Sequence, residues 1–106
     1  MPMKLKLCTR AELAPGGAKK IEIEGRPPIA VWNVEGSFYC TDDTCTHGGA
    51  SLTEDGHLLD ETVECSWHGG MFDVRSGEPT AAPCTELLKT YKVSVEGDDV
   101  FALLDE

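Results

Sequence analysis

The sequence has no long hydrophobic run and few basic residues. Its longest late apolar run, Val100 to Leu104, is far too short to span a membrane, and no apolar run of the signal-peptide kind follows Met1. Lysine and arginine total 9 against 19 aspartates and glutamates, which gives a formal net charge of −10. Nucleic acid is disfavoured as a partner, because its phosphates require a basic face. We therefore expect a soluble, cytoplasmic protein that binds neither a membrane nor nucleic acid.

The sequence also lacks the long amphipathic stretch that would predict a helix of several turns. Short segments of alternating or apolar residues are separated by turn signals instead. Thr9 and Glu12 form a capping-box pattern, which predicts one helical turn. The chain of 106 residues is predicted to be a single all-β domain, residues 1–106. We expect strands at residues 4–7, 18–24, 29–34, 37–40, 58–64, 71–74, 87–95 and 100–104, a turn at 25–28 and a loop at 80–84.

Histidine is scarce, yet two of the three histidines lie within three positions of a cysteine. The pairs are Cys45 with His47 and Cys65 with His68, and two glycines follow each histidine. Glycine lets the backbone approach a bound group closely and take a positive φ. The repetition indicates a ligand site and disfavours a chance arrangement.

Two cysteines and two histidines could form three kinds of site. Structural zinc sites usually present Cys-x2–4-Cys and His-x3–5-His pairs, which is not the order here, although a zinc-binding β module stays an alternative. A nucleophilic Cys–His dyad would use one pair and leave the other without a purpose. A [2Fe–2S] cluster with two thiolates on one iron and two imidazoles on the other uses all four residues and fits best.

The pattern Cys-x-His-x17-Cys-x2-His resembles the Rieske family. The wider stretch from Asp43 to Pro83 resembles the cluster-binding part of Rieske-type ferredoxins, which serve bacterial aromatic-ring dioxygenases. This resemblance implies a Rieske fold of antiparallel β-sheets. In that fold a small cluster-binding subdomain, here about residues 41–83, is carried on a basal β domain.

The resemblance also assigns the four ligands of one [2Fe–2S] cluster per chain. It implies that Cys45 and Cys65 bind one iron through their thiolates. His47 and His68 would bind the other iron through Nδ1, with Nε2 facing solvent.

Rieske oxygenases share this motif, so the fold alone does not decide the function. An oxygenase needs a second iron on two histidines and a carboxylate, but only His57 remains after the cluster takes two histidines. A Gly-x-Gly-x-x-Gly nucleotide fingerprint is also missing from the sequence. We therefore expect no catalytic residue and interpret the chain as a one-electron carrier.

The family implies the partners of such a carrier. A flavin-dependent NAD(P)H reductase would supply electrons and a terminal Rieske oxygenase would receive them, with the ferredoxin expected to be a monomer. Two alternatives stay open: a ferredoxin or small redox subunit of a different oxidase or reductase system, and a module that kept the fold but lost its cluster.

Four positions separate this sequence from the high-potential branch of the family. That branch joins its two cluster loops by a disulfide, whereas the matching positions here are Ala50 and Trp67. It also places hydroxyl donors where this chain has Gly70 and Phe72. Because such donors stabilise the reduced cluster, we predict a potential in the low part of the Rieske range of about −150 to +300 mV.

The remaining residues of interest receive simpler interpretations. His57 is predicted to lie at the surface in a hairpin turn, and Cys8 and Cys40 are predicted to be small apolar strand residues. Cys84 is either a packed thiol or a contact that tunes the cluster. Acidic residues near the motif could steer a partner or be solvated loop charges: Asp42, Asp43, Glu54 and Asp55.

Overall fold

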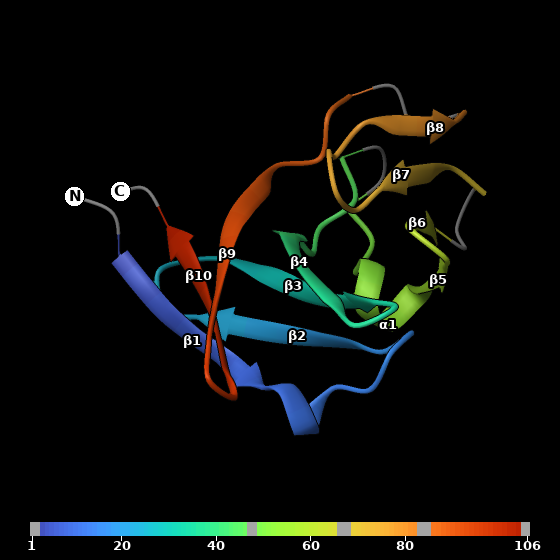
Figure 1. Ribbon diagram of the computed structural model, residues 1–106. Coiled ribbons are helices and arrows are strands. Elements are labelled where there is room, and N and C mark those ends of the chain that lie inside the picture. Colours follow the sequence, from blue (N-terminus) through green and yellow to red (C-terminus); the bar gives the residue numbers. More distant parts are fainter. Residues whose placement is uncertain (1–2, 47–48, 66–68, 83–85, 105–106) are drawn as a thin grey trace.

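The computed structural model describes residues 3–46, 49–65, 69–82 and 86–104. Within these residues, ten strands form two antiparallel sheets, one of six strands and one of four (Figure 1). The fold of antiparallel β-sheets predicted from the sequence is confirmed. No helix in these ranges has the length and apolar character needed to cross a membrane.

The larger sheet has the strand order β1-β10-β9-β4-β3-β2. All of its neighbouring strands are antiparallel, and a 3₁₀ turn at Arg10–Glu12 joins the first strand toward the second. The strands are β1 (Met3–Thr9), β2 (Ala18–Ile23), β3 (Arg26–Val34), β4 (Ser37–Asp42), β9 (Thr90–Glu96) and β10 (Asp99–Leu104).

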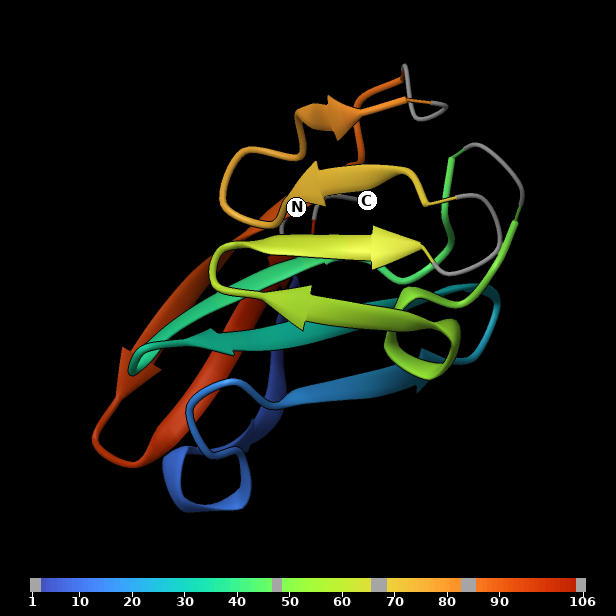
Figure 2. The same cartoon turned by 90° about the vertical axis from the view of Figure 1, so that its right-hand side faces the viewer.

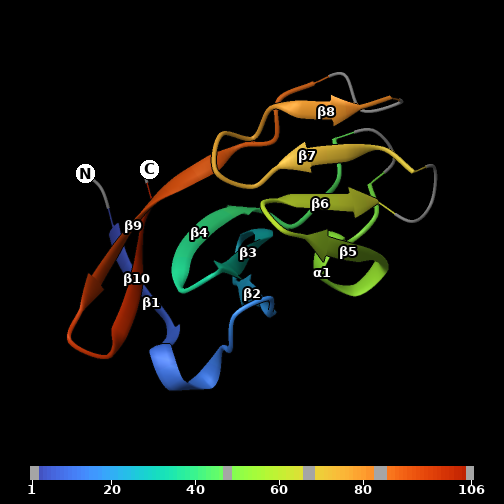
Figure 3. The same ribbon diagram turned by 45° about the vertical axis from the view of Figure 1, so that its right-hand side comes forward.

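The smaller sheet is built entirely between β4 and β9. The chain leaves the large sheet after β4, forms the short helix α1 and four strands, and returns through β9, which pairs with β4. Figures 2 and 3 show this sheet lying to one side of the large sheet. Its elements are α1 (Leu52–Asp55), β5 (Gly56–Leu59), β6 (Thr62–Cys65), β7 (Met71–Asp73) and β8 (Pro79–Ala81).

Strand β3 serves two hydrophobic cores, because successive side chains of a strand point to opposite faces. Ala30 and Trp32 belong to the core shared with the small sheet. Ile29 and Val31 belong to the core enclosed by β1, β9 and β10. All four side chains are at most 1% exposed. The small sheet therefore packs directly on β3, the second strand from one edge of the large sheet.

Several local predictions from the sequence are confirmed. The backbone N–H of Thr9 donates to Glu12 Oε1 at 2.7 Å, as the capping-box pattern predicts. Glu35 and Gly36 have φ of 50° and 95° and form the tight turn between β3 and β4.

Other local predictions are wrong. The segment 58–64 is two strands and not one, because Asp60 takes a φ of 55° and turns the chain back between β5 and β6. The segment 25–28 is not all turn, since β3 already begins at Arg26. The expected loop at 80–84 contains the end of β8. His57 lies in β5 and not in a turn, although its side chain is exposed as predicted.

Candidate cluster-binding site

The two predicted thiolate ligands lie in the core between the sheets. Cys45 follows β4 by three positions, and Cys65 is the last residue of β6. Each is 2% exposed, and both pack in the core that contains Trp32 and Phe72. The structure thus brings the two predicted cysteines into one buried cluster. The predicted ligands His47 and His68 lie outside the described residues.

The loop of residues 45–50, called here the first loop, is closed by two backbone hydrogen bonds. Cys45 N–H donates to the Ala50 carbonyl at 2.8 Å, and Gly49 N–H donates to the Cys45 carbonyl at 3.0 Å. Gly49 has a φ of 78°, which favours glycine. A Cβ placed there would meet no atom within 4 Å, so the requirement is conformational and not steric crowding.

The loop of residues 65–70, called here the second loop, repeats this closure. Cys65 N–H donates to the Gly70 carbonyl at 2.8 Å, and Gly69 N–H donates to the Cys65 carbonyl at 2.8 Å. Gly69 has a φ of 76° and equally open space around its Cβ direction. Each loop therefore begins with a buried cysteine and has the same closure. In sequence, the histidine is the third residue of the first loop and the fourth of the second.

The correspondence continues into the base of each loop. The base is the pair of residues that lie two positions before the loop begins and two positions after it ends. In the second loop, β6 and β7 pair Val63 with Phe72. In the first loop, the equivalent positions are Asp43 and Leu52, and Leu52 N–H donates to the Asp43 carbonyl at 2.7 Å. A shift of 20 residues superimposes one pattern on the other. A fully buried valine in one loop therefore corresponds to a buried aspartate in the other.

The carboxylate of Asp43 fixes the base of the first loop. It accepts hydrogen bonds from Ser51 Oγ at 2.6 Å, from Thr53 N–H at 2.9 Å and from Thr53 Oγ1 at 2.7 Å. Ser51 is also the N-cap of α1, so the same group holds the start of that helix. The side chain of Asp43 is 1% exposed. Asp43 therefore cannot contact a partner, although its place near the motif had made it a candidate for docking.

The neighbouring Asp42 is half-buried and is also held by a side-chain network. Its carboxylate accepts a hydrogen bond from the Tyr91 hydroxyl, which accepts one from Arg26 Nη2 at 2.6 Å. Burial, together with the hydrogen bond to Asp42, raises the pKa of Tyr91 to about 12. This network joins β3, β4 and β9 where the chain leaves the large sheet. Of the four acidic residues considered for docking, Glu54 is the exposed one.

The donor set fits an iron–sulfur cluster on the part that the structure describes. A buried thiolate is costly unless a cation compensates it, and a metal ion would do so for Cys45 and Cys65 together. The described residues hold no group of three or more metal-binding side chains. Two of the four predicted ligands lie outside them, so the fit rests on the two cysteines and the matching loops.

Two further cysteines have the structural role predicted for them. Cys8 in β1 and Cys40 in β4 are buried in the core of the large sheet. Burial raises the pKa of the Cys40 thiol to about 12 and also raises that of Cys8. Both are therefore neutral thiols at neutral pH. Cys84 lies outside the described residues, and its role stays a prediction.

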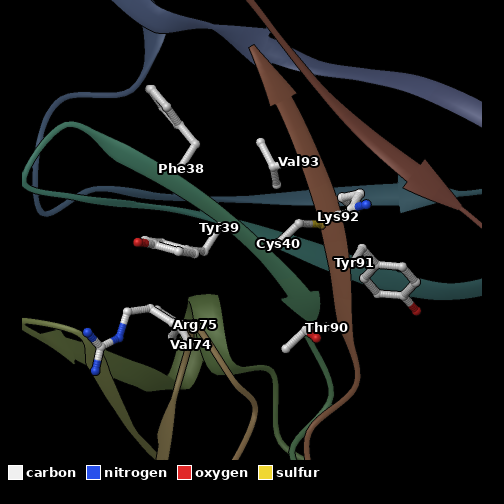
Figure 4. A pocket seen from close by; sticks show the side chains of 9 residues that line it. All are labelled: Phe38, Tyr39, Cys40, Val74, Arg75, Thr90, Tyr91, Lys92 and Val93. Atoms are coloured by element: carbon white, nitrogen blue, oxygen red, sulfur yellow. The ribbon is translucent and has the colours of Figure 1, made fainter.

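A surface groove of about 410 Å³ lies elsewhere, where β4 and β9 diverge beyond their short pairing (Figure 4). Neither Cys45 nor Cys65, the two predicted ligands that the structure describes, lines this groove. Nothing in the sequence pattern indicated it. Its lining residues are Phe38, Tyr39, Cys40, Val74, Arg75, Thr90, Tyr91, Lys92 and Val93.

Comparison with known proteins gives consistent matches. The ferredoxin component of biphenyl 2,3-dioxygenase from Rhodococcus jostii is 45% identical over 100 residues, covering 94% of this chain and 92% of that protein. The ferredoxin component of the p-cumate 2,3-dioxygenase system from Pseudomonas putida is 43% identical over 95 residues, covering 90% and 80%. A structure titled as a complex of reduced oxygenase and oxidized ferredoxin in carbazole 1,9a-dioxygenase contains a similar chain. That chain matches with a TM-score of 0.90 and 41% identity, over 93% of this chain and 91% of its own length.

The family model that matches is the Rieske [2Fe–2S] domain, over residues 3–92. This range contains the small sheet, both loops and the large sheet up to the start of β9. The chain therefore belongs to the Rieske [2Fe–2S] domain family and carries one such cluster.

Proposed function

We propose that this chain is the ferredoxin component of an aromatic-ring dioxygenase system, with its cluster held by Cys45 and Cys65 on one iron and by His47 and His68 on the other. The observation that carries the ligand assignment is the pair of matching closed loops, each of which begins with a buried cysteine. When bound, the cluster takes up and releases one electron. The relatives that are named ferredoxin components support the same role.

The chain itself supplies no catalytic group for oxygenation. Beyond His47 and His68 it has His57, which is exposed on β5 in the small sheet. Two histidines and a carboxylate for a second iron cannot be assembled from it. The chain is therefore an electron-transfer component, and its role depends on partners that do the chemistry.

We expect two partners: a flavoprotein reductase that oxidises NAD(P)H, and a terminal Rieske oxygenase. The similar chain in the carbazole 1,9a-dioxygenase structure is a ferredoxin in complex with its oxygenase, which supports the second partner. The net charge of −10 would steer encounter with basic surfaces. We further propose that the chain is a cytoplasmic monomer, and that residues 41–83 act as its cluster-binding subdomain.

The docking surface would include the segment that touches the first loop. Thr46 Oγ1 donates to the Glu86 carbonyl at 3.2 Å, which fixes this segment beside Cys45. The adjacent Leu87 is 66% exposed, the largest value among the exposed large hydrophobic residues of the described chain. An exposed leucine close to a redox centre is suited to apolar contact with a partner, because burial of such a residue contributes about 1.5–3 kcal/mol.

The ligand assignment is tested by analysis of the purified protein. Iron and acid-labile sulfide should each be close to two per chain, with the absorption spectrum of an oxidised [2Fe–2S] centre. His68→Ala should lose the cluster, and the matched control His57→Ala should keep it. A colourless protein with stoichiometric zinc would overturn the proposal.

The carrier role is tested by reconstitution. Aromatic substrate should be hydroxylated only when a reductase, this chain and a terminal oxygenase are all present. Product formed by the isolated chain with a chemical reductant and oxygen would contradict the assignment. Failure with every aromatic-ring oxygenase, together with rapid reduction of another oxidase, would favour the alternative of a carrier for a different system.

A further inference from the structure

Asp43 holds a buried negative charge two residues from Cys45. Its side chain is 1% exposed, and its carbonyl binds Leu52 N–H at the base of the first loop. The three short hydrogen bonds to its carboxylate come from Ser51 and Thr53. These donors are neutral, so they orient the carboxylate and stabilise its charge without cancelling it.

The nearest cation compensates this charge only in part. Lys20 Nζ lies 3.9 Å from Asp43 Oδ2 and 3.3 Å from Glu54 Oε1, so one ammonium serves two carboxylates. Partial burial lowers the pKa of Lys20, but Glu54, Asp43 and Glu22 together more than offset this and raise the pKa above its usual value. The three side chains therefore carry a net charge of −1. Glu54 is 66% exposed, so solvent screens its charge far more than that of Asp43.

The second loop shows that loop closure does not require this charge. Val63 occupies the position equivalent to Asp43 and is fully buried, yet the second loop has the same backbone closure. A buried carboxylate is costly compared with a buried aliphatic residue. Its presence beside one cysteine but not the other indicates a role beyond closing the loop.

We infer that Asp43 is a positioning residue that also lowers the reduction potential of the site, and that Lys20 opposes it. This inference rests on the proposed binding of the cluster at Cys45. Reduction adds one negative charge at the site, so a nearby buried carboxylate disfavours it and a nearby ammonium favours it. Asp43 therefore lowers the reduction potential and Lys20 raises it, both through electrostatics.

The test is the midpoint potential of the cluster-loaded protein and of four variants. Asp43→Asn keeps a carbonyl oxygen for the Thr53 donors but removes the charge, and should shift the potential upward. Lys20→Gln should shift it downward, and the double variant should return close to the wild type. The matched control Glu54→Gln also removes one negative charge in the same cluster of side chains, and should shift the potential upward by less.

Ionic strength separates the buried charge from the exposed one. The shift caused by Asp43→Asn should persist at high salt, whereas that of Glu54→Gln should fade. A rearranged loop would not shift the potential in opposite directions in Asp43→Asn and Lys20→Gln. Opposite shifts therefore distinguish an electrostatic role from a purely structural one. Absorption spectra of each variant establish that its cluster is intact.

Two results would overturn the inference: an upward or absent shift in Lys20→Gln, or an Asp43→Asn shift no larger than that of Glu54→Gln. If Asp43→Asn does not retain its cluster, Lys20→Gln alone decides, because a downward shift supports the inference and any other result ends it. A wild-type protein that binds no [2Fe–2S] cluster would instead refute the proposed function.

Discussion

The first and second loops are closed by the same backbone hydrogen bonds but have different means of support. The second loop connects two paired strands, and its base is an apolar pair, Val63 and Phe72. The first loop has a charged base, in which a buried carboxylate is bound by three donors. At the first loop, an isolated antiparallel bridge between Thr44 and Ser51 and a local polar network stand where the second loop has two paired strands. The polar base places a buried carboxylate two residues before Cys45, whereas the apolar base places a valine two residues before Cys65.

The largest expected effect is on the apolar base of the second loop. Phe72 is 0% exposed and packs in the core that contains both cysteines. Phe72→Ala should therefore lower the free energy of unfolding by about 3–5 kcal/mol, because it removes a buried aromatic ring and leaves a cavity. Thermal unfolding of the cluster-loaded protein measures this. Leu59→Ala is the control, since Leu59 is 51% exposed and its loss should have little effect.

The polar base of the first loop should be the next most sensitive. Asp43→Ala would remove the charged acceptor of the partly buried donors of Ser51 and Thr53, which costs about 2–3 kcal/mol. The cluster should also be released sooner on heating, as absorbance loss would show. If Asp43→Ala unfolds at the wild-type temperature, the carboxylate does not support the first loop.

A smaller loss of stability is expected from the hydrogen-bond network of Arg26, Tyr91 and Asp42, which lies beside the base of the first loop. Tyr91→Phe removes a hydroxyl that bonds Arg26 and Asp42, and should cost about 1.5–3 kcal/mol, because both of those partners are charged. The pKa of Tyr91 is raised from 10.0 to about 12 in the folded chain, so its neutral hydroxyl stabilises the fold fully below pH 10. This contribution should disappear as the pH rises from 10 through 12.

Chemical denaturation across that alkaline range measures the Tyr91 contribution. The difference in stability between wild type and Tyr91→Phe should be constant up to pH 10 and then narrow. A difference that stays constant up to pH 12 would mean that the hydroxyl is not protected from ionisation in the folded chain.

The smallest losses of stability are expected from substitution of the two loop glycines, and these two losses should be nearly equal. Gly49 and Gly69 have nearly the same φ, and neither has an atom within 4 Å of an added Cβ. Gly49→Ala and Gly69→Ala should each cost about 1–2 kcal/mol from backbone strain alone. Unequal losses of stability or of bound cluster would show that the two closures are not equivalent.

Much of this architecture could be predicted from the sequence, because alternating residues specify half-buried strands and the two Cys–His pairs specify a ligand pattern. The turn at Asp60 could not, since a non-glycine residue with positive φ has no strong signal. Pro28 suggested a turn, but its carbonyl accepts from Asp43 N–H at 3.1 Å within an extended segment.

The role of Asp43 was missed for a different reason. In a chain with 19 acidic residues, one more aspartate is typical of a solvated surface. Its burial depends on Ser51 and Thr53, which lie eight and ten positions away and return to it only because the first loop closes. The signal that could have found it is the alignment of the two loops on each other, which places Asp43 opposite Val63.

Strand β3 has a consequence for how the chain unfolds. Trp32 and Ala30 fill one core, while Ile29 and Val31 fill the other. If the small sheet separated from the large one, the buried apolar side chains of β3 that it covers would be exposed to water. The small sheet is therefore not an independent folding unit, and the protein should melt in one cooperative transition. Amide protons of β3 should accordingly exchange with solvent only when the entire molecule opens.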